Sequence, residues 1–498
     1  MSPTLPELDR SATAPLTAQI ADHFAAAIEQ GQLRAGDRLP PIRELARRCA
    51  VTRATVQDAY RQLAERRLVE GTVGRGTVVC AGAVPMASRT AVGNGLPLSP
   101  FATAALRRTL EMPGAPTLGA GQRLVANFAE LAPDSGRFPV DEWRAAMDAV
   151  LLRSGPELLG YGMAANGLPE LREAFAARAA VAEPAAPVPE VLVTGGAQQA
   201  LDLALRAFCA PGDTVVVTDP SYHQMFGLLK AHGLEVAAVP FGRDGLDLDR
   251  LQHVLARGGV RLVYLMPTFH NPTGRTLDRA QRERLVEVLA GTEVPVVEDE
   301  YQQSLRFRGE PLPTLRSLDP RGLTVTVASA SKELFPALRI GWVLGASRVL
   351  QPMAAVKRFV DLETSPLLQA ALVEFLARGA FDRYLGELRA ELARRHAALA
   401  GAARESLPAE CHVGEADGGY VAWLEMPRAG QADRLTEMAS ERGVRVVPGR
   451  AFDPFDRPSS GVRLSLTRAD CDAIRAGVAV LGDCAREIVA DPVATPFL

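Results

Sequence analysis

The sequence predicts a multi-domain protein in which a small α+β unit precedes an α/β unit with a mostly parallel sheet and a smaller α+β unit. Its 498 residues exceed what one hydrophobic core usually organises. Roughly the first 80 residues combine short helical periods with a glycine-rich alternating stretch. From about residue 126 onward, helical stretches alternate with short β-branched runs, the pattern of a parallel sheet covered by helices.

The composition excludes several classes of protein. Hydrophobic residues make up 47% and charged residues 23%, and no apolar run is long enough to cross a bilayer. No basic-then-apolar signal segment opens the chain, so we expect a cytoplasmic protein without membrane contact. The six cysteines form no C-x-x-C pair, which argues against a disulfide framework and against a metal site. The net charge of −3 gives no general attraction to nucleic acid, so charge must be read locally.

The first unit has the pattern of a DNA-binding module. Apolar residues at helical spacing occur over residues 15–29, and a short helix follows in IRELARRC. Ala50-Val51 form a tight turn, and Thr52 caps a further helix, TRATVQDAYRQLAERR. Two short helices across a turn predict a helix-turn-helix, and the segment LVEGTVGRGTVVC predicts a β-hairpin, or wing, behind it. Arginines cluster from Arg43 to Arg53, which suggests one basic face.

Further along the chain we expect three parts. Residues 12–80 form the DNA-binding domain, and residues 81–125 form a linker with one helix near Thr103 to Leu110. Residues 126–490 form the last domain, whose larger part spans about 150–390 and whose smaller part spans about 391–490. The expected strands of the larger part are VLVT, TVVVT, LVYLM, VPVVEDE and TVTVAS, and those of the smaller part are GYVAWLEM, VRVVPG and VRLSLT.

Lysine is scarce, with arginine supplying every basic residue except Lys230, Lys332 and Lys357. Lys332 follows the run TVTVAS in a turn that also holds Ser329 and Ser331, and Arg339 comes seven residues later. Hydroxyls and a guanidinium suit a phosphate, and an amine suits a Schiff base with pyridoxal phosphate (PLP). The alternative is a surface lysine in a loop, which the apolar flanks and the scarcity of lysine disfavour.

Two further motifs supply what PLP chemistry needs. Glu298-Asp299-Glu300 ends the strand VPVVEDE, at the sheet edge where α/β proteins bind ligands, and we expect Asp299 to hold the pyridine nitrogen protonated. The motif TGGAQQ follows the strand VLVT and opens a helix whose amides suit a phosphate. Each motif has a plainer interpretation, as a solvated loop or an ordinary glycine turn.

In this order the motifs resemble the fold-type I PLP enzymes, specifically the class I aminotransferases, over roughly residues 126–490. The resemblance implies a pyridoxal 5′-phosphate cofactor, a homodimer, and a catalytic set of Lys332, Asp299 and Tyr222, with Tyr222 stacked on the ring. It assigns phosphate contacts to Ala197, Gln198, Ser329, Ser331 and Arg339, and the phenolic oxygen to Asn271 and Tyr301. It implies that Arg463, with Asn271, binds substrate, and that Tyr161 reaches the phosphate of the neighbouring subunit. One departure from the family pattern is Leu131, where many relatives have glycine, so substrate access beside this loop stays open.

The amino-terminal unit resembles the GntR family of winged-helix repressors, most strongly in LPPIRELARRCAVTRATVQDAYRQL and in the GRG of the wing. The resemblance implies that Arg43, Thr52, Arg53 and Thr55 contact DNA and that Arg75 on the wing enters a minor groove or touches the backbone. Gln57 stands where relatives carry arginine, so base preference stays open. A helical protein-interaction module is the alternative.

The fusion of these two modules is typical of regulators of the MocR and GabR type, and the whole chain resembles them. That resemblance implies a homodimeric transcriptional regulator that binds paired half-sites in double-stranded DNA and senses an amino compound or PLP at Lys332. A second hypothesis is an active aminotransferase acting on an amino acid and a keto acid. A third is a sensor for which PLP itself is the signal.

Overall fold

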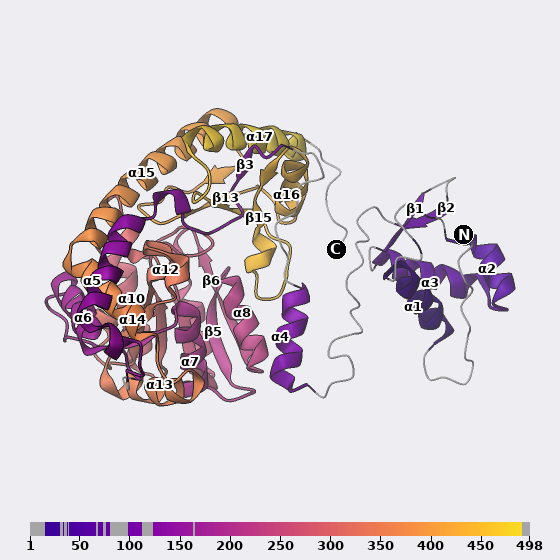
Figure 1. The fold of residues 1–498 in the computed structure, drawn as a ribbon. Helices are drawn as coiled ribbons and strands as arrows, with labels where there is room; N and C mark the ends of the chain where they lie inside the picture. The colour runs from indigo at the N-terminus through magenta and orange to yellow at the C-terminus, as the bar shows by residue number, and fades with distance from the viewer. Residues whose placement is uncertain are drawn as a thin grey trace. The chain divides into compact units, whose positions relative to one another are not determined.

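The computed structural model describes residues 15–29, 33, 37, 39–65, 68–72, 76–79, 98–111, 123–162 and 165–490. The chain divides into two compact units, Met1–Ser99 and Pro100–Leu498 (Figure 1).

The first unit is a three-helix module with a β-hairpin. Its elements are α1 (Leu16–Glu29), α2 (Ile42–Arg48), α3 (Arg53–Glu65) and the antiparallel strands β1 (Val69–Thr72) and β2 (Gly76–Val79). Ala50 has a left-handed φ of 50°, which makes the turn between α2 and α3 tight. The hydroxyl of Thr52 accepts the Thr55 N–H at 3.2 Å and so caps α3. The helix-turn-helix and the hairpin predicted from the sequence are confirmed.

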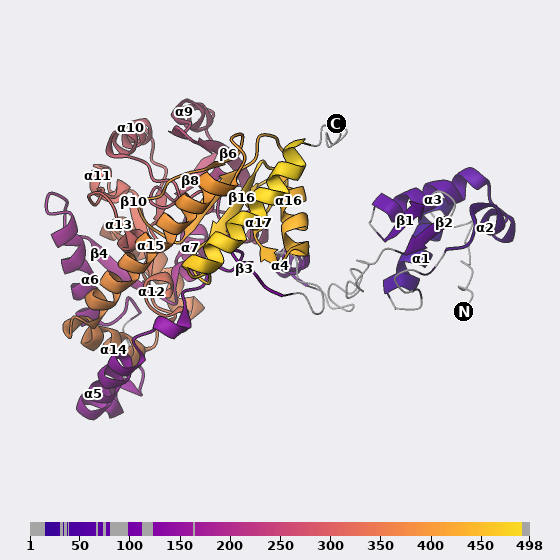
Figure 2. The same cartoon turned by 90° about the horizontal axis from the view of Figure 1, so that it is seen from above.

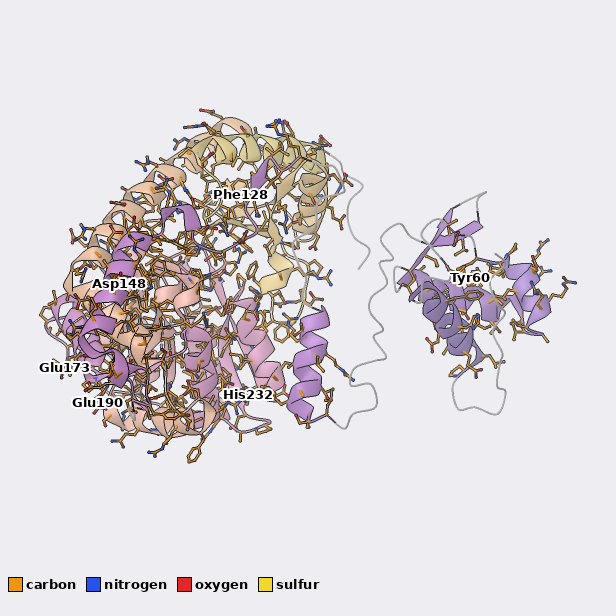
Figure 3. The ribbon with its side chains drawn as sticks, viewed as in Figure 1. Tyr60, Phe128, Asp148, Glu173, Glu190 and His232 are labelled. Atoms are coloured by element: carbon orange, nitrogen blue, oxygen red, sulfur yellow. The ribbon has the colours of Figure 1, made fainter. Side chains whose placement is uncertain are left out.

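Apolar residues from all three helices form the core of this unit. Ile20 and Phe24 of α1 pack with Leu45 of α2 and with Val56 of α3, and all four are fully buried. The ring of Tyr60, labelled in Figure 3, adds an edge contact to Phe24 at 6.0 Å. This core fixes α2 and α3 relative to each other and leaves their outer faces exposed.

An eight-stranded sheet organises the larger part of the second unit, in the order β4-β11-β10-β9-β8-β5-β6-β7. The strands are β4 (Glu190–Thr194), β5 (Thr214–Asp219), β6 (Glu235–Gly242), β7 (Gly245–Leu246), β8 (Val260–Leu265), β9 (Val296–Asp299), β10 (Thr324–Ser329) and β11 (Gly341–Gly345). Strands β6, β5, β8, β9 and β10 are parallel, whereas β11 runs antiparallel to β10 and β4, and β7 to β6. The predicted mostly parallel sheet is therefore confirmed.

Helices cover both faces of this sheet. One face packs against α7 (Ala197–Phe208), α8 (His223–Ala231) and α13 (Ser347–Val360). The other face packs against α5 (Val140–Leu158), α6 (Pro169–Ala182), α9 (Leu248–Ala256), α10 (Arg279–Ala290), α11 (Leu315–Leu318) and α14 (Pro366–Ala377). Alternating residues of each strand face the two layers, so both sides are buried and the strands are nearly continuous apolar runs.

Short elements complete the larger part. They are α12 (Ala330–Glu333) and the 3-10 helices η1 (Ser135–Arg137), η2 (Gln303–Leu305) and η3 (Pro336–Leu338). The helix expected near Thr103 to Leu110 is α4 (Pro100–Glu111), which packs against α8 (Figure 1).

The smaller part is an α+β layer. It holds a four-stranded sheet of order β12-β13-β16-β15. Its elements are α15 (Ala380–Ser406), β12 (His412–Val413), β13 (Val421–Glu425), α16 (Gln431–Glu441), β15 (Val447–Pro448), η4 (Gly449–Phe452), β16 (Gly461–Ser465) and α17 (Cys471–Ala490). Helices α15 and α17 run side by side (Figures 1 and 2).

The chain entering the second unit also joins the smaller part. Strand β3 (Ala126–Asn127) pairs in parallel with β14 (Val444–Arg445). Phe128, which directly follows β3, is fully buried in the core of the smaller part and is labelled in Figure 3. Residues 129–131 therefore pass between the smaller part and the carboxyl edge of the large sheet. Among the described residues, no helix is both long and apolar enough to cross a membrane.

Candidate functional site

A cavity of about 670 Å³ opens at the carboxyl ends of the parallel strands. Most residues predicted for a cofactor line it: Lys332, Asp299, Tyr301, Asn271, Tyr222, Ala197, Gln198, Ser329, Ser331, Arg339 and Arg463. Most of them lie at or just after the ends of strands of the large sheet, which meet at this edge because those strands are parallel. Arg463 comes instead from β16 of the smaller part. Of the predicted cofactor and substrate residues, Tyr161 alone does not line the cavity.

Asp299 ends β9 and points into the cavity with 3% of its surface exposed. Its Oδ2 accepts a hydrogen bond from the Tyr264 hydroxyl at 2.8 Å, whereas Oδ1 is buried without a partner. Burial raises the pKa of Asp299 to about 7. A positively charged N–H donor against Oδ1 would satisfy this oxygen and keep the carboxylate ionised.

The two glutamates beside Asp299 in the sequence form buried ion pairs on the opposite face of the sheet. Glu298 and Glu300 alternate away from the cavity toward Arg282, which is fully buried. Arg282 also donates to the carbonyls of Leu277 and Pro267, at 2.9 and 3.1 Å. The acidic triplet is therefore divided, and only its middle member faces the ligand cavity.

Lys332 lies on α12 at the floor of the cavity. Its Nζ donates a hydrogen bond to the Leu131 carbonyl oxygen. Burial, and then the charges of Arg463 and Arg339, lower the pKa of Lys332 to about 8. An appreciable fraction of the amine is thus neutral near neutral pH, as nucleophilic attack on an aldehyde requires. Leu131, the departure noted in the sequence, lines the cavity and contacts the lysine through its backbone.

Arg339 joins the glycine turn to the serines. It donates from Nη2 to the Gly195 carbonyl at 2.9 Å and from Nη1 to Ser331 Oγ at 3.2 Å. Gly196 has a φ of +107°, and a Cβ there would lie 2.7 Å from the Arg339 guanidinium. Only glycine permits this approach. Helix α7 begins at Ala197, so its amides, the serines and Arg339 together fit a phosphate group.

A second layer of polar residues holds the glycine turn in place. Gln199 accepts the Gly195 N–H at 2.7 Å and donates to Asp361 at 2.8 Å. Asp361 in turn accepts a hydrogen bond from the fully buried Lys357 at 2.7 Å. Lys357 is one of the three lysines of the chain, so the same scarcity that marked Lys332 could have drawn attention to it.

Arg463 reaches the cavity from β16 of the smaller part. It is 4% exposed, its guanidinium lies 5.1 Å from the centre of the Phe452 ring, and its Nε is buried without a hydrogen-bond partner. Burial lowers the pKa of Arg463 to about 10. A buried arginine with an unsatisfied donor suits a carboxylate. Elsewhere in the cavity, Asn271 Oδ1 is buried without a partner, and the Tyr222 hydroxyl donates to Gln198 at 3.5 Å.

These observations fit pyridoxal phosphate. Asp299 Oδ1 offers an acceptor for a protonated ring nitrogen, Lys332 offers an amine, and the loop at Gly196 offers a phosphate site. Two further residues of the site were not predicted from the sequence. Tyr264 donates to Asp299; it pairs with Val297 across β8 and β9, so the register and the alternation of strand residues place it on the face of Asp299. His223 lines the cavity.

Tyr161 lies apart from this cavity. Its side chain is 80% exposed, just beyond the carboxyl end of α5, and the next residue, Gly162, donates its N–H to Glu363 at 2.9 Å. A role at the phosphate of another subunit therefore stays a prediction.

The residues predicted to contact DNA gather around the start of α3. Arg43 on α2 and Arg53 at the first position of α3 are exposed. Thr52 is exposed but uses its hydroxyl to cap α3, and it lies 2.8 Å from the hydroxyl of the half-buried Thr55. Gln57 is exposed on the same helix. Arg75 lies outside the described residues.

Two family models match the chain. Residues 126–477 match the model "Aminotransferase class I and II", and residues 16–79 match "Bacterial regulatory proteins, gntR family". The two matches follow one another in the order that the sequence motifs predicted.

Individual proteins and solved structures are also similar to this chain. The probable rhizopine catabolism regulatory protein MocR of Rhizobium meliloti is 28% identical over 484 residues, covering 95% of this chain and 94% of that protein. The 2-aminoadipate transaminase of Thermus thermophilus is 32% identical over 74% of this chain and 91% of its own. Among solved structures, the kynurenine aminotransferase of Pyrococcus horikoshii, in a complex with PMP, superposes with a TM-score of 0.71 at 27% identity. That structure covers 74% of this chain and 93% of its own.

Proposed function

Because the chain belongs to the aminotransferase class I and II family and carries a gntR-family helix-turn-helix, we propose that this PLP-dependent transcriptional regulator senses a small amino compound, or PLP itself, at Lys332. One observation carries the proposal: a cavity equipped for PLP and an exposed helix-turn-helix occur in one chain. The regulator MocR, with the same order of modules along nearly its whole length, supports it.

When bound, PLP supplies an aldehyde that captures amines and a ring that withdraws electrons. The residues of this chain decide what can be captured. Lys332 Nζ would bind the aldehyde, and Asp299 would accept a hydrogen bond from the ring nitrogen and so favour its protonated form. Arg339 and the serines would hold the phosphate, so that the cofactor would be retained independently of its bond to Lys332.

Arg463 points to the class of ligand. Its buried position and its unsatisfied Nε favour a ligand carboxylate beside it in the cavity. A ligand with an amine near Lys332 and a carboxylate near Arg463 is an amino acid or a close analogue. Such a ligand regulates DNA binding only if it prefers one arrangement of the protein, since equal affinity for two arrangements shifts nothing.

We expect a cytoplasmic homodimer that binds paired half-sites. Helix α5 and the segment after it expose large apolar side chains, including Leu152 at 88%, Leu159 at 70% and Tyr161 at 80%. Exposed apolar surface of this kind is typical of protein interfaces. A second copy covering it would bring Tyr161 close to the phosphate site of its neighbour and would supply two helix-turn-helix units for a two-fold operator.

An active aminotransferase is the second candidate function. The observation in its favour is that the cavity retains a lysine, a ring-nitrogen carboxylate and a carboxylate-binding arginine together. In that reaction Lys332 Nζ would carry a proton between two carbon atoms, and Arg463 would orient the amino acid. A sensor whose signal is PLP itself uses the same residues without an amine ligand.

One experiment separates these functions. The full chain is loaded with PLP, and the visible absorbance of the bound cofactor is compared between the wild type and Lys332→Ala. The same two proteins are then used to select fragments from genomic DNA with and without PLP. A band that requires Lys332, together with selection of specific fragments, supports the regulator. A band with no specific fragments, and many turnovers of an amino donor with a keto acid, supports the enzyme instead.

A further inference from the structure

Helix α4 is the first described helix after the winged helix, and residues 80–99 join it to β2 along the chain. It packs along α8 (Figure 1), and its Phe101 ring makes an edge contact of 5.2 Å with His232, which Figure 3 labels. Arg206 of α7 lies 5.8 Å over the same ring. The second unit therefore binds the chain at α4, directly beside two helices that begin at the cofactor cavity.

Arg108 is the residue of α4 that faces this region. Its aliphatic stem lies against Gly227 of α8, since a Cβ at Gly227 would be 3.6 Å from the Arg108 Cγ. The Nε of Arg108 is buried without a hydrogen-bond partner. Burial, and then the charges of Arg463 and Arg108, lower the pKa of His223 to about 4. The charge of Arg108 also helps to lower the pKa of Asp456, after the stronger effect of Arg450. Arg108 is thus coupled to both α8 and the loop after η4.

His223 connects this region to the cavity. It is the first residue of α8, follows Tyr222 directly and lines the cavity. Its ring makes an edge contact with Phe452 at 5.6 Å, and the same Phe452 ring lies 5.1 Å from the Arg463 guanidinium. The His223 Nδ1 is buried without a partner. Contacts therefore run from Arg463 through Phe452 to His223 at the start of α8, the helix on which α4 packs.

The loop after η4 belongs to the smaller part and already touches the larger one. Arg457 pairs with Asp219 at the end of β5 and with Asp453 in its own loop, and Arg450 pairs with Asp456 at 2.8 Å. Phe452, the last residue of η4, directly precedes this loop, and a ligand carboxylate that moved the Arg463 guanidinium would therefore also move the Phe452 ring beside it. Any shift of the loop changes the position of Asp456 relative to Arg108.

We propose that Arg108 is a positioning residue through which α4 reports whether the cavity beside His223 and Phe452 is occupied. The inference rests on the proposed function, because α4 leads along the chain to the DNA-binding unit. Occupancy that fixes His223 and Phe452 also fixes the loop of Asp456, whose charge attracts the Arg108 that lies against Gly227, and so stabilises α4 on α8. Helix α4 is then the two-state element that ligand binding biases.

Hydrogen exchange of the full chain, followed by mass spectrometry, tests this inference. The probe is aminooxyacetate added to the PLP-loaded protein, because it combines an amine that reacts with the cofactor and a carboxylate for Arg463. In the wild type, we expect exchange across residues 100–111 to slow by roughly tenfold, which corresponds to about 1.4 kcal/mol of added local stability. In Arg108→Ala the slowing is lost, although the probe still changes the cofactor absorbance.

Two variants complete the test. Arg107→Ala removes an exposed arginine from the same helix and should respond like the wild type. Arg108→Lys keeps the stem and the charge and should restore most of the response. If the absorbance shows the probe bound while α4 exchanges equally with and without it, or if Arg108→Ala responds like the wild type, the inference is wrong. Failure to form any cofactor band would instead overturn the proposed function itself.

Discussion

The cofactor cavity and the DNA-binding face differ most in burial. Asp299 and Arg463 are 3% and 4% exposed, whereas Arg43 and Arg53 lie on the surface of short helices. Burial changes the chemistry of the cavity, because it raises the pKa of Asp299 to about 7 and lowers that of Lys332 to about 8. Exposure suits the other region, since side chains that read base edges must reach into a groove. One chain therefore separates a reactive, desolvated site from a solvated recognition surface.

The largest expected effect is the loss of covalent cofactor attachment in Lys332→Ala. Lys332 is the one lysine among the residues that line the cavity, so no other amine can replace it there. The visible band of the bound cofactor should disappear, as absorbance of the purified protein would show. Lys230→Ala serves as a control, because Lys230 lies at the far end of α8 and is absent from the cavity. A wild-type band in Lys332→Ala would place the attachment elsewhere.

A change on the exposed surface should leave the cavity intact. We expect Arg53→Ala to weaken sequence-specific DNA binding by about 1–3 kcal/mol, or roughly 5- to 150-fold. The cofactor band should not change, because Arg53 belongs to the other unit. Arg61→Ala is the matched control: Arg61 lies on the same helix but pairs with Asp58 at 2.8 Å. Fluorescence anisotropy with a selected genomic fragment measures the DNA affinity of both variants. Equal losses of affinity in Arg53→Ala and Arg61→Ala would refute the assigned recognition surface.

The pKa of Lys332 gives the cavity a pH dependence of its own. Only the neutral amine attacks an aldehyde, and burial lowers the pKa of Lys332 to about 8. The rate of PLP attachment to the apoprotein should therefore rise about tenfold per pH unit below pH 8 and level off above it. Stopped-flow absorbance measures this rate. A midpoint near pH 10.4, the ordinary lysine value, would contradict the account of burial.

The smallest effect concerns the cap of α3. Thr52→Ala removes the hydroxyl that accepts the Thr55 N–H and should cost about 1 kcal/mol, or roughly fivefold faster exchange at the first turn of α3. Gln57→Ala, an exposed change on the same helix, should leave that exchange nearly unaltered. Hydrogen exchange of the amide of Thr55 gives the readout. Equal effects of the two changes would mean that the cap contributes little to the placement of Arg53.

The sequence predicted those features that local pattern determines. The β-branched runs became β4, β5, β8, β9 and β10, and Thr52 became the cap of α3. Strands β6 and β11 escaped prediction because Pro240 interrupts one and glycines end the other. Individual motifs such as Gly195-Gly196 and Asp299 were visible in the sequence because each lies where a strand ends.

Contacts between distant segments could not be predicted in the same way. Three hydrogen bonds lead from Gly195 through Gln199 and Asp361 to Lys357, and they join a loop to a helix more than 150 residues later in the sequence. The periodicity of neither segment indicates that the two are in contact. The passage of residues 126–128 into the smaller part likewise depends on tertiary pairing with β14. Such contacts follow from packing of the complete domain rather than from the residues of one segment.

The central claim is that occupancy at Lys332 changes DNA binding. The most direct test measures the dissociation constant of the full chain for one selected genomic fragment, without PLP, with PLP, and with PLP plus an L-amino acid panel. The account predicts a change in affinity on adding PLP or an amino acid in the wild type, and no change in Lys332→Ala. Identical affinities under all conditions in the wild type, while absorbance shows PLP bound, would contradict it.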